Sequence, residues 1–232
     1  MGLGARKTLP PESDNNIFWT TMSDLMLGLA IVFMTLFVLA MTGFSQQTVK
    51  QKVQQIEVNK ELTEKLKQEN IIVEIDELTG DVKISDLELF ELGSATLSPK
   101  GRAYLDKFGP IYINTIFSNT EVINGIRNIE IQGHTDSHMF AGVKDPNEQY
   151  LLNMTLSLQR ANAVAQYILK TKYDPKYNKK FKELMVVQGK SNSEPILVNG
   201  KEDYAKSRRV EMLLKTKQLD VVDVLFGGIL HY

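Results

Sequence analysis

The sequence predicts a single N-terminal transmembrane helix, a helical linker and then an α+β domain with a mixed sheet and helices on one face. Three observations predict this order: an uncharged apolar stretch from Leu25 to Phe44, a polar stretch at 45–70, and short strands that alternate with helices from Ile71 onward. The 232 residues are enough for one or two domains. The predicted parts are a cytoplasmic tail at 1–16, a transmembrane helix at 17–44, a helical linker at 45–70, the α+β domain at 71–217 and a C-terminal tail at 218–232.

The composition excludes several classes of function. With 27 Lys and Arg against 28 Asp and Glu, the formal net charge is -1, whereas a protein with a broad nucleic-acid surface carries an excess of basic residues. The sequence has no cysteine, which removes disulfides, iron–sulfur clusters, thiolate zinc sites and catalytic thiols. We therefore expect neither nucleic acid as a partner nor thiol chemistry.

The apolar stretch has the length of a membrane span. About 20 residues at a rise of ~1.5 Å per residue reach ~30 Å, the thickness of the hydrocarbon core of a bilayer. Arg6 and Lys7 precede it, as they would in a cleaved secretory signal, but the stretch is too long for a signal and no small-x-small cleavage site follows. The length and the missing cleavage site predict a retained single-pass helix, and the flanking charges predict that the N-terminus lies in the cytoplasm and the α+β domain outside, which in a bacterium means an inner-membrane span with a periplasmic domain.

Asp24 lies inside the apolar region, because Ile17 to Met22 precede it and Leu25 follows it. A carboxylate at the centre of a membrane helix costs about 2.5–3.5 kcal/mol and is tolerated where it faces a partner, a water-filled cavity or an ion path. A carboxylate that a proton or a small cation can neutralise is the minimum requirement for an ion carrier. Two alternatives stay open on physical grounds: Asp24 marks the aqueous boundary of a helix that begins at Leu25, or it joins two helices by a polar contact.

Phe18-Trp19 followed by Asp24-Leu25-Met26 at the start of a single span resembles the B subunits of ion-driven membrane motors, the family that includes the flagellar stator protein MotB and the Zorya phage-defence protein ZorB. The resemblance implies that Asp24 carries the transported proton or sodium ion and that no other cofactor is needed. It also implies a homodimer inside a pentameric ring of a multi-span, MotA-like or ZorA-like partner. Ser23 stands where many relatives have alanine, which leaves the choice between proton and sodium open.

The linker carries two short apolar stripes, the first of Val49, Val53 and Ile56 and the second of Val58, Leu62 and Leu66. The shift between the stripes breaks any heptad repeat, so we expect an exposed helix with a thin apolar seam rather than a long coiled coil. The same family resemblance implies that this segment acts as a plug and dimerising linker.

The outer domain is expected to alternate short strands with helices. Gly and Pro signals and apolar periodicity predict these elements. The predicted strands are 71–76, 82–85, 126–132, 184–188 and 210–215, and the predicted helices are 100–113 and 155–172.

Three polar clusters in this domain are candidates for a site. They are Gly133-His134-Thr135-Asp136 after a strand, Asn153 with Leu156-Ser157-Leu158-Gln159-Arg160-Ala161 on a helix, and Ser207-Arg208-Arg209-Val210-Glu211 before the last strand. A carboxylate beside guanidinium groups can hold a zwitterion, because the carboxylate takes an ammonium group and arginine takes a carboxylate. Spacing alone equally allows a structural salt bridge between Asp136 and Arg160.

The three clusters in this order resemble the OmpA-like peptidoglycan-binding domain, over about residues 71–215. The resemblance implies that Asp136 binds the amine and Arg160 the carboxylate of diaminopimelate in the peptide stem. It places Thr135, Asn153 and Arg209 in the lining of the same pocket. Two departures leave the ligand details open: an extra stretch between Asp136 and Asn153 that includes 140–146, and Ser207 where asparagine is usual. The second departure is shared with Zorya B subunits.

Neither a metal site nor a catalytic site is expected. His134 and His138 are separated like helical metal ligands but fall at a strand-to-loop junction, and no third ligand is evident. Hydrolysis by His134 and Asp136 lacks a poised nucleophile. The sequence therefore favours a motor subunit that is not an enzyme, with a passive tether between membrane and cell wall as the alternative. Flagellar rotation, gliding and phage defence stay open, although the motif details are most similar to those of Zorya proteins.

Overall fold

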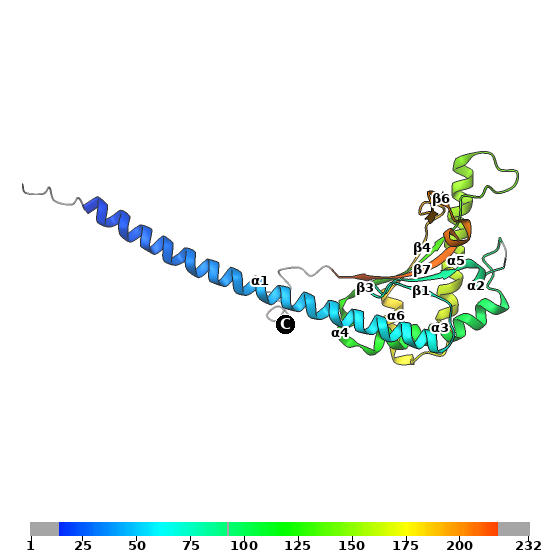
Figure 1. The fold of residues 1–232 in the computed structure, drawn as a ribbon, viewed down its shortest axis with the longest axis horizontal. Coiled ribbons are helices and arrows are strands. Elements are labelled where there is room, and N and C mark those ends of the chain that lie inside the picture. The colour runs from blue at the N-terminus through cyan, green and yellow to red at the C-terminus, as the bar shows by residue number, and fades with distance from the viewer. Residues whose placement is uncertain (1–13, 92, 218–232) are drawn as a thin grey trace, which may run out of the picture. The chain divides into compact units, whose positions relative to one another are not determined.

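The computed structural model describes residues 14–217 except Leu92, so the predicted C-terminal tail and most of the predicted N-terminal tail lie outside the described residues (Figure 1). The chain divides into two units, of which the first ends at Thr48 and the second begins at Val49. The helix α1 (Asp14–Gln68) has 55 residues and belongs to both.

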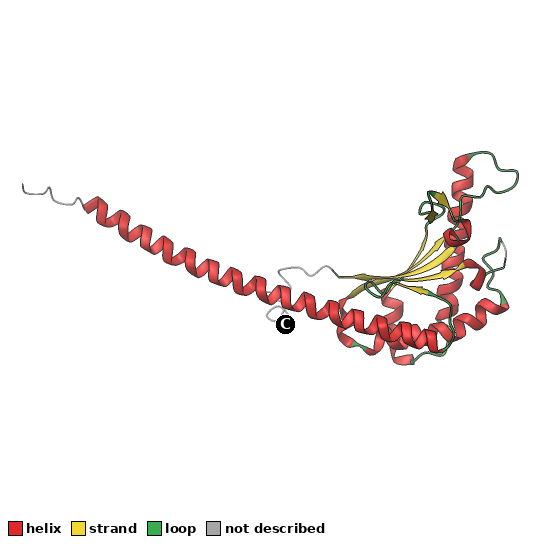
Figure 2. Ribbon diagram, viewed as in Figure 1, coloured by secondary structure: helices red, strands yellow, loops and turns green. Residues whose placement is uncertain are grey.

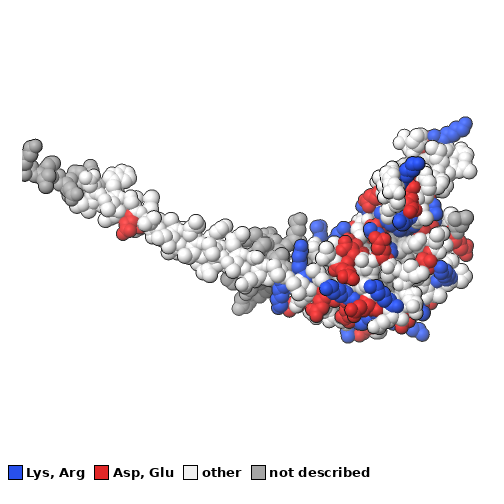
Figure 3. All heavy atoms as spheres, viewed as in Figure 1, with Lys and Arg blue, Asp and Glu red and all other residues white. Residues whose placement is uncertain are grey.

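The membrane-length part of α1 is Asn16–Gly43, whose 28 residues have a mean hydropathy of 2.5. All of its side chains except Ala40 are largely exposed, and Figure 3 shows this segment as uncharged apart from one acidic group. All four of its threonines donate their hydroxyl groups to carbonyl oxygens about one turn earlier, for example Thr42 Oγ1 to the carbonyl of Val38 at 2.7 Å. The hydroxyl groups are thus satisfied within the helix, as a bilayer requires.

The second unit contains seven strands and the remaining helices. The helices are α2 (Asp86–Leu89), α3 (Pro99–Ser118), α4 (Thr120–Gly125), α5 (Pro146–Ile168), the 3-10 helix η1 (Pro175–Tyr177), α6 (Asn178–Leu184) and α7 (Tyr204–Ser207). The strands are β1 (Glu74–Ile75), β2 (Val82–Ser85), β3 (Ile126–His134), β4 (Met185–Gly189), β5 (Leu197–Val198), β6 (Lys201–Glu202) and β7 (Arg209–Thr216).

Five of these strands form one mixed sheet in the order β1-β2-β7-β3-β4, and β5 and β6 form a separate hairpin. β3 and β4 are parallel, whereas β7 runs antiparallel to both β2 and β3. The last strand of the chain therefore lies at the centre of the sheet, and the long helices cover one of its faces (Figure 2). This architecture confirms the predicted mixed sheet with helices on one face.

A pair of glycines lets α5 approach the sheet closely. Gly133 and Gly189 are partners in the parallel register of β3 and β4. A Cβ atom on Gly133 would lie 2.0 Å from the carbonyl oxygen of Ser157, and one on Gly189 would lie 2.8 Å from the backbone nitrogen of Leu158. Because no side chain fits there, the sequence brings the middle of α5 against the ends of both strands.

The second half of α1 is part of the domain core, which differs from the exposed linker expected at 45–70. Val58, Leu62 and Leu66 are buried in the same hydrophobic cluster as the sheet and α3. Asn59 Nδ2 also donates to the carbonyl oxygen of Glu77 at 3.1 Å. The second apolar stripe was predicted correctly. The residues that it packs against lie later in the chain, so the local pattern does not predict this contact.

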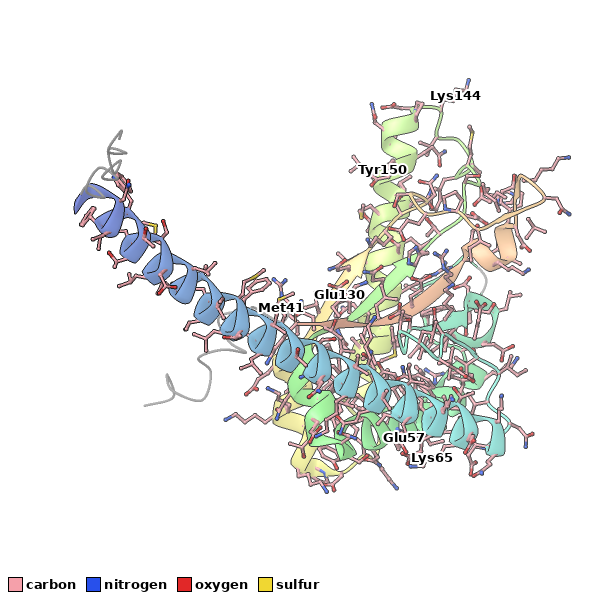
Figure 4. All side chains as sticks on the ribbon, turned by 60° about the vertical axis from the view of Figure 1, so that its left-hand side comes forward. Met41, Glu57, Lys65, Glu130, Lys144 and Tyr150 are labelled. Atoms are coloured by element: carbon pink, nitrogen blue, oxygen red, sulfur yellow. The ribbon has the colours of Figure 1, made fainter. Side chains whose placement is uncertain are left out.

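The other differences concern where elements begin and end. The strand expected at 71–76 pairs only over Glu74–Ile75, and the helix expected at 155–172 begins at Pro146. Asp145 caps α5 by accepting a hydrogen bond from the backbone N–H of Asn147 at 3.0 Å, so part of the extra stretch is helical. Figure 4 shows Lys144 and Tyr150 at the end of α5 that extends beyond the sheet.

Candidate functional site

Asp24 lies within a continuous helix, eight residues after Asn16, or about 12 Å along the helix axis. It is exposed, and within residues 14–217 it is the one charged side chain between Asn16 and Gly43. The helix itself begins at Asp14 and not at Leu25, so Asp24 does not mark the start of the helix. The carboxylate sits inside the apolar segment Asn16–Gly43.

The second site forms where β3 ends against α5. The backbone N–H of Thr135 donates to the carbonyl oxygen of Ser191 at 2.9 Å, which holds the turn after β3 in place. Thr135 and Asp136 follow the strand, while Asn153 and Arg160 face them from α5. The close approach of α5 at Gly133 thus brings two clusters that are far apart in the sequence onto one site.

These residues line a cavity of about 370 Å³, which we call the β3 cavity. It is large enough for part of a small polar ligand. Four of the five predicted binding residues, Thr135, Asp136, Asn153 and Arg160, contribute to its wall. The complete lining consists of Asp86, Gly93, Thr135, Asp136, His138, Met139, Phe140, Asn153, Leu156, Arg160 and Arg208.

Arg160 forms the deep wall of the β3 cavity and is 2% exposed. Its Nε donates to the carbonyl oxygen of Ser94 at 3.0 Å, and its Nη1 lies 3.3 Å from Oδ1 of Asp86. The guanidinium carbon lies 5.4 Å from the ring centre of Phe90, within range of a cation–π contact. Burial lowers the pKa of Arg160 and raises the pKa of Asp86, and the two opposite charges offset part of both effects.

Asp136 stands at the outer wall and is held by two neighbours. Its Oδ2 accepts a hydrogen bond from Nη1 of Arg208 and lies 3.0 Å from Nδ1 of His138. Its Oδ1 accepts from the backbone N–H of His138 at 3.2 Å. Burial acts to raise the pKa of Asp136, but the hydrogen bonds from Arg208 and His138 outweigh burial and hold this pKa below its usual value.

Arg209 does not reach the β3 cavity, so the prediction that it lines the same pocket is wrong. Its Nε donates to Oε1 of Glu211 at 2.6 Å, and its Nη1 donates to the carbonyl oxygens of Glu194 and Ser207. Successive residues of an extended chain point to opposite sides, so Arg208 enters the cavity and Arg209 turns away. Arg209 lines a separate cavity of about 270 Å³.

Asp86 and Arg208 are the charged cavity residues that the prediction left out. Arg208 lies next to Arg209 in the predicted motif. Because side chains alternate along a strand, only one of the two arginines can face the β3 cavity. Asp86 follows β2, and its place depends on the pairing of β2 with β7, where Ser85 is the partner of Arg209. The local sequence around Asp86 carries no sign of this pairing.

Several polar atoms in the β3 cavity have no hydrogen-bonding partner within the described chain. They share one small volume and include both donors and acceptors. The atoms are Asp86 Oδ1, Thr135 Oγ1, Arg160 Nη1 and Arg208 Nε, of which Asp86 Oδ1 and Arg160 Nη1 form an ion pair with each other at 3.3 Å. Buried polar groups are normally fully hydrogen-bonded, so this incomplete pairing is suited to a ligand with both donor and acceptor groups.

His134 is 1% exposed and lies below the β3 cavity, between two carboxylates. Its Nε2 lies 3.6 Å from Oε2 of Glu211, and its Nδ1 lies 4.0 Å from Oε2 of Glu194. His138 instead contacts Asp136 and packs against the ring of Tyr204 at a tilt of 50°. The two histidines are therefore used separately, and residues 14–217 without Leu92 contain no group of three His, Asp or Glu that could hold a metal ion.

Comparison with known proteins agrees with this arrangement. Residues 89–209 match the OmpA family. The Zorya protein ZorB from Escherichia coli is 34% identical over 224 residues, which cover 90% of this chain and 92% of ZorB.

A solved structure has the same fold. A MotB-like protein from Desulfovibrio vulgaris superposes with a TM-score of 0.51 at 22% identity, over 73% of this chain and 96% of that one. The periplasmic domain of Helicobacter pylori MotB gives a TM-score of 0.47 at 16% identity, over 69% of this chain and 99% of that one. With a curated relative matched along nearly its whole length and a domain model matched across the β3 cavity, the chain belongs to the ZorB family of Zorya proteins and carries an OmpA-family domain.

Proposed function

We propose that this chain is the B subunit of an ion-driven rotary membrane motor, with Asp24 as the group that carries a proton or a sodium ion. The observation that carries the proposal is the single carboxylate inside Asn16–Gly43 of a ZorB-family chain. An ionised carboxylate at this depth costs about 2.5–3.5 kcal/mol, and such residues mark ion pathways in membrane proteins. Neutralisation by an entering ion removes that cost, so binding of the ion changes the free energy of the helix in its surroundings.

The partner in this proposal is a pentameric ring of a multi-span, MotA-like or ZorA-like subunit around two copies of α1. An ion that enters from outside neutralises Asp24, weakens its charge interaction with the ring and leaves on the cytoplasmic side. One elementary charge that crosses a potential of 100 mV releases about 2.3 kcal/mol, which is enough to bias each step of the ring in one direction. The subunit spans the inner membrane once, with its outer domain in the periplasm.

The OmpA-family domain anchors the motor by binding peptidoglycan in the β3 cavity. Asp136 takes the ammonium group and Arg160 the carboxylate of the diaminopimelate in the peptide stem, while Thr135 and Asn153 line the pocket. The charged side chains of the cavity and their incompletely hydrogen-bonded atoms support a zwitterionic ligand over a purely apolar one. An anchor of this kind holds the dimer still while the ring turns, and the setting that the ZorB relative supports is defence against phages.

The motor is tested by Asp24→Asn in the full chain, assembled with its multi-span partner and reconstituted into liposomes. We expect ion flux to fall to the background level while the complex stays assembled, because asparagine cannot bind and release a proton. Asp24→Glu keeps the carboxylate and is the matched control, with part of the flux retained. Equal flux through Asp24→Asn and wild type would reject the motor and favour a passive tether between membrane and cell wall.

The anchor is tested by a pull-down of the full chain on purified peptidoglycan. Asp136→Asn and Arg160→Ala should abolish retention, whereas Arg102→Ala, an exposed arginine outside the β3 cavity, should leave it unchanged. Circular dichroism of each variant shows whether the domain is folded, which matters for the buried Arg160. Undiminished retention of a folded Asp136→Asn variant would overturn the assignment of the β3 cavity to peptidoglycan.

A further inference from the structure

The carboxylate of Asp136 has no free oxygen for a ligand. Its Oδ2 is bonded to Arg208 Nη1 and is 3.0 Å from the ring of His138, and its Oδ1 accepts from the backbone of His138. Three of the roughly four acceptor positions of this carboxylate are thus taken, and a ligand ammonium group that forms a close ion pair with Oδ2 competes with Arg208 for that oxygen.

Arg208 is the donor that can move. Its side chain is 25% exposed at the rim of the β3 cavity, and its Nε has no partner within the described chain. The Oδ2 of Asp86 lies 3.9 Å from that Nε, so a second carboxylate is close to the same guanidinium group. The backbone of Arg208 is held by the N–H of Asp86, which donates to its carbonyl oxygen at 3.1 Å, so rotation of the side chain alone exchanges one carboxylate for the other.

Arg160 lacks this freedom. It is buried, its Nε is bonded to the backbone of Ser94, and its guanidinium group lies over Phe90. Any rearrangement of charge in the β3 cavity therefore falls to Arg208. The empty cavity is also electrically balanced, because the two carboxylates of Asp86 and Asp136 face the two guanidinium groups of Arg160 and Arg208.

We propose that Arg208 is an internal competitor for the ligand, occupying the ammonium position on Asp136 while the cavity is empty and turning toward Asp86 when a zwitterionic ligand enters. The inference rests on the proposed anchoring function, whose site it describes in more detail. Ligand binding is then an exchange of one cation for another on Asp136, and its affinity is set by the difference between the two ion pairs. Arg208 also keeps the second carboxylate, Asp86, from drawing in simple cations.

The test measures the affinity of the full chain in detergent for two probes by isothermal titration calorimetry. The probes are meso-diaminopimelate, and pimelate, which has the same carbon chain and carboxylates without the ammonium groups. The variant Arg208→Gln removes the competitor, and Lys206→Gln is the matched control, because it removes one positive charge two residues away on an exposed side chain outside the β3 cavity.

We expect Arg208→Gln to bind meso-diaminopimelate about tenfold more tightly than wild type, a change of about 1.4 kcal/mol, and pimelate more weakly. Lys206→Gln should change neither affinity by more than about twofold, since exposed charges contribute little. Arg208→Met keeps the apolar stem and serves as the second variant where Arg208→Gln is unfolded.

Weaker or unchanged binding of meso-diaminopimelate by both folded Arg208 variants would overturn the proposal, and weaker binding would make Arg208 a direct ligand for the carboxylate. A different result would reject the proposed anchor. If a folded Asp136→Asn variant binds peptidoglycan and meso-diaminopimelate like wild type, the β3 cavity is not the binding site. Tighter binding by the Arg208 variants together with loss of binding in Asp136→Asn supports both.

Discussion

Leu62→Ala tests whether the second half of α1 is part of the outer domain. Leu62 is 0% exposed and belongs to the core cluster of the second unit. The substitution removes three buried carbons, worth about 2.4 kcal/mol at ~0.8 kcal/mol each, and leaves a cavity that raises the loss to about 2.5–5 kcal/mol. For a domain of this size we expect the melting temperature to fall by roughly 5–15 °C.

The assay is thermal unfolding of the full chain in detergent, followed by near-ultraviolet circular dichroism of the outer domain's tyrosines. Val53→Ala is the control on the same helix, because Val53 is 58% exposed and its truncation should change the free energy of unfolding by less than about 0.5 kcal/mol. Equal melting temperatures for the two variants would show that this part of α1 does not pack in the core.

The remaining predictions concern a buried carboxylate and a close contact. Burial acts to raise the pKa of Glu211, but the ring of His134, 3.6 Å away, and the hydrogen bond from Arg209 outweigh burial and lower this pKa from 4.5 to about 2. The folded state therefore gains about 3 kcal/mol above pH 4.5 that is lost as the pH falls from about 4.5 to 2, and Glu211→Gln should remove this part of the pH dependence of urea unfolding. If the free energy of unfolding of Glu211→Gln depends on pH as steeply as that of the wild type, Glu211 is not the origin of the acid sensitivity. Gly133→Ala should cost about 3 kcal/mol or lower the yield of folded protein, because its Cβ would meet the carbonyl oxygen of Ser157 at 2.0 Å; wild-type stability in the same urea titration would show that α5 can shift freely.

The parts of the fold that depend on local patterns were predictable from the sequence. The apolar helix needs only length and lack of charge, and β2, β3, β4 and β7 lie within one or two residues of their predicted bounds because apolar runs end at turn residues. The hairpin of β5 and β6 was missed, since each strand has two residues and no apolar alternation. Such short pairs form through tertiary contacts, which single-sequence patterns do not contain.

The candidate site was predictable in part for the same reason. Thr135, Asp136, Asn153 and Arg160 lie on elements that could be placed, so their meeting followed from the fold. Whether Arg208 or Arg209 faces the β3 cavity depends on the register of β7. A shift of one residue would exchange the directions in which the two side chains point. Asp86 enters through the strand pairing of β2 with β7, across more than a hundred residues of chain.

The burial of Val58, Leu62 and Leu66 in the core has a mechanical consequence. In the proposed anchor, any load on the cell wall enters the OmpA-family domain through a helix whose own side chains complete the hydrophobic core. Because this helix folds cooperatively with the domain, pulling it out of the core would also unfold the β3 cavity. We therefore expect an excessive force to unfold the domain and release its ligand. We do not expect an intermediate in which a detached helix remains connected to an intact binding domain.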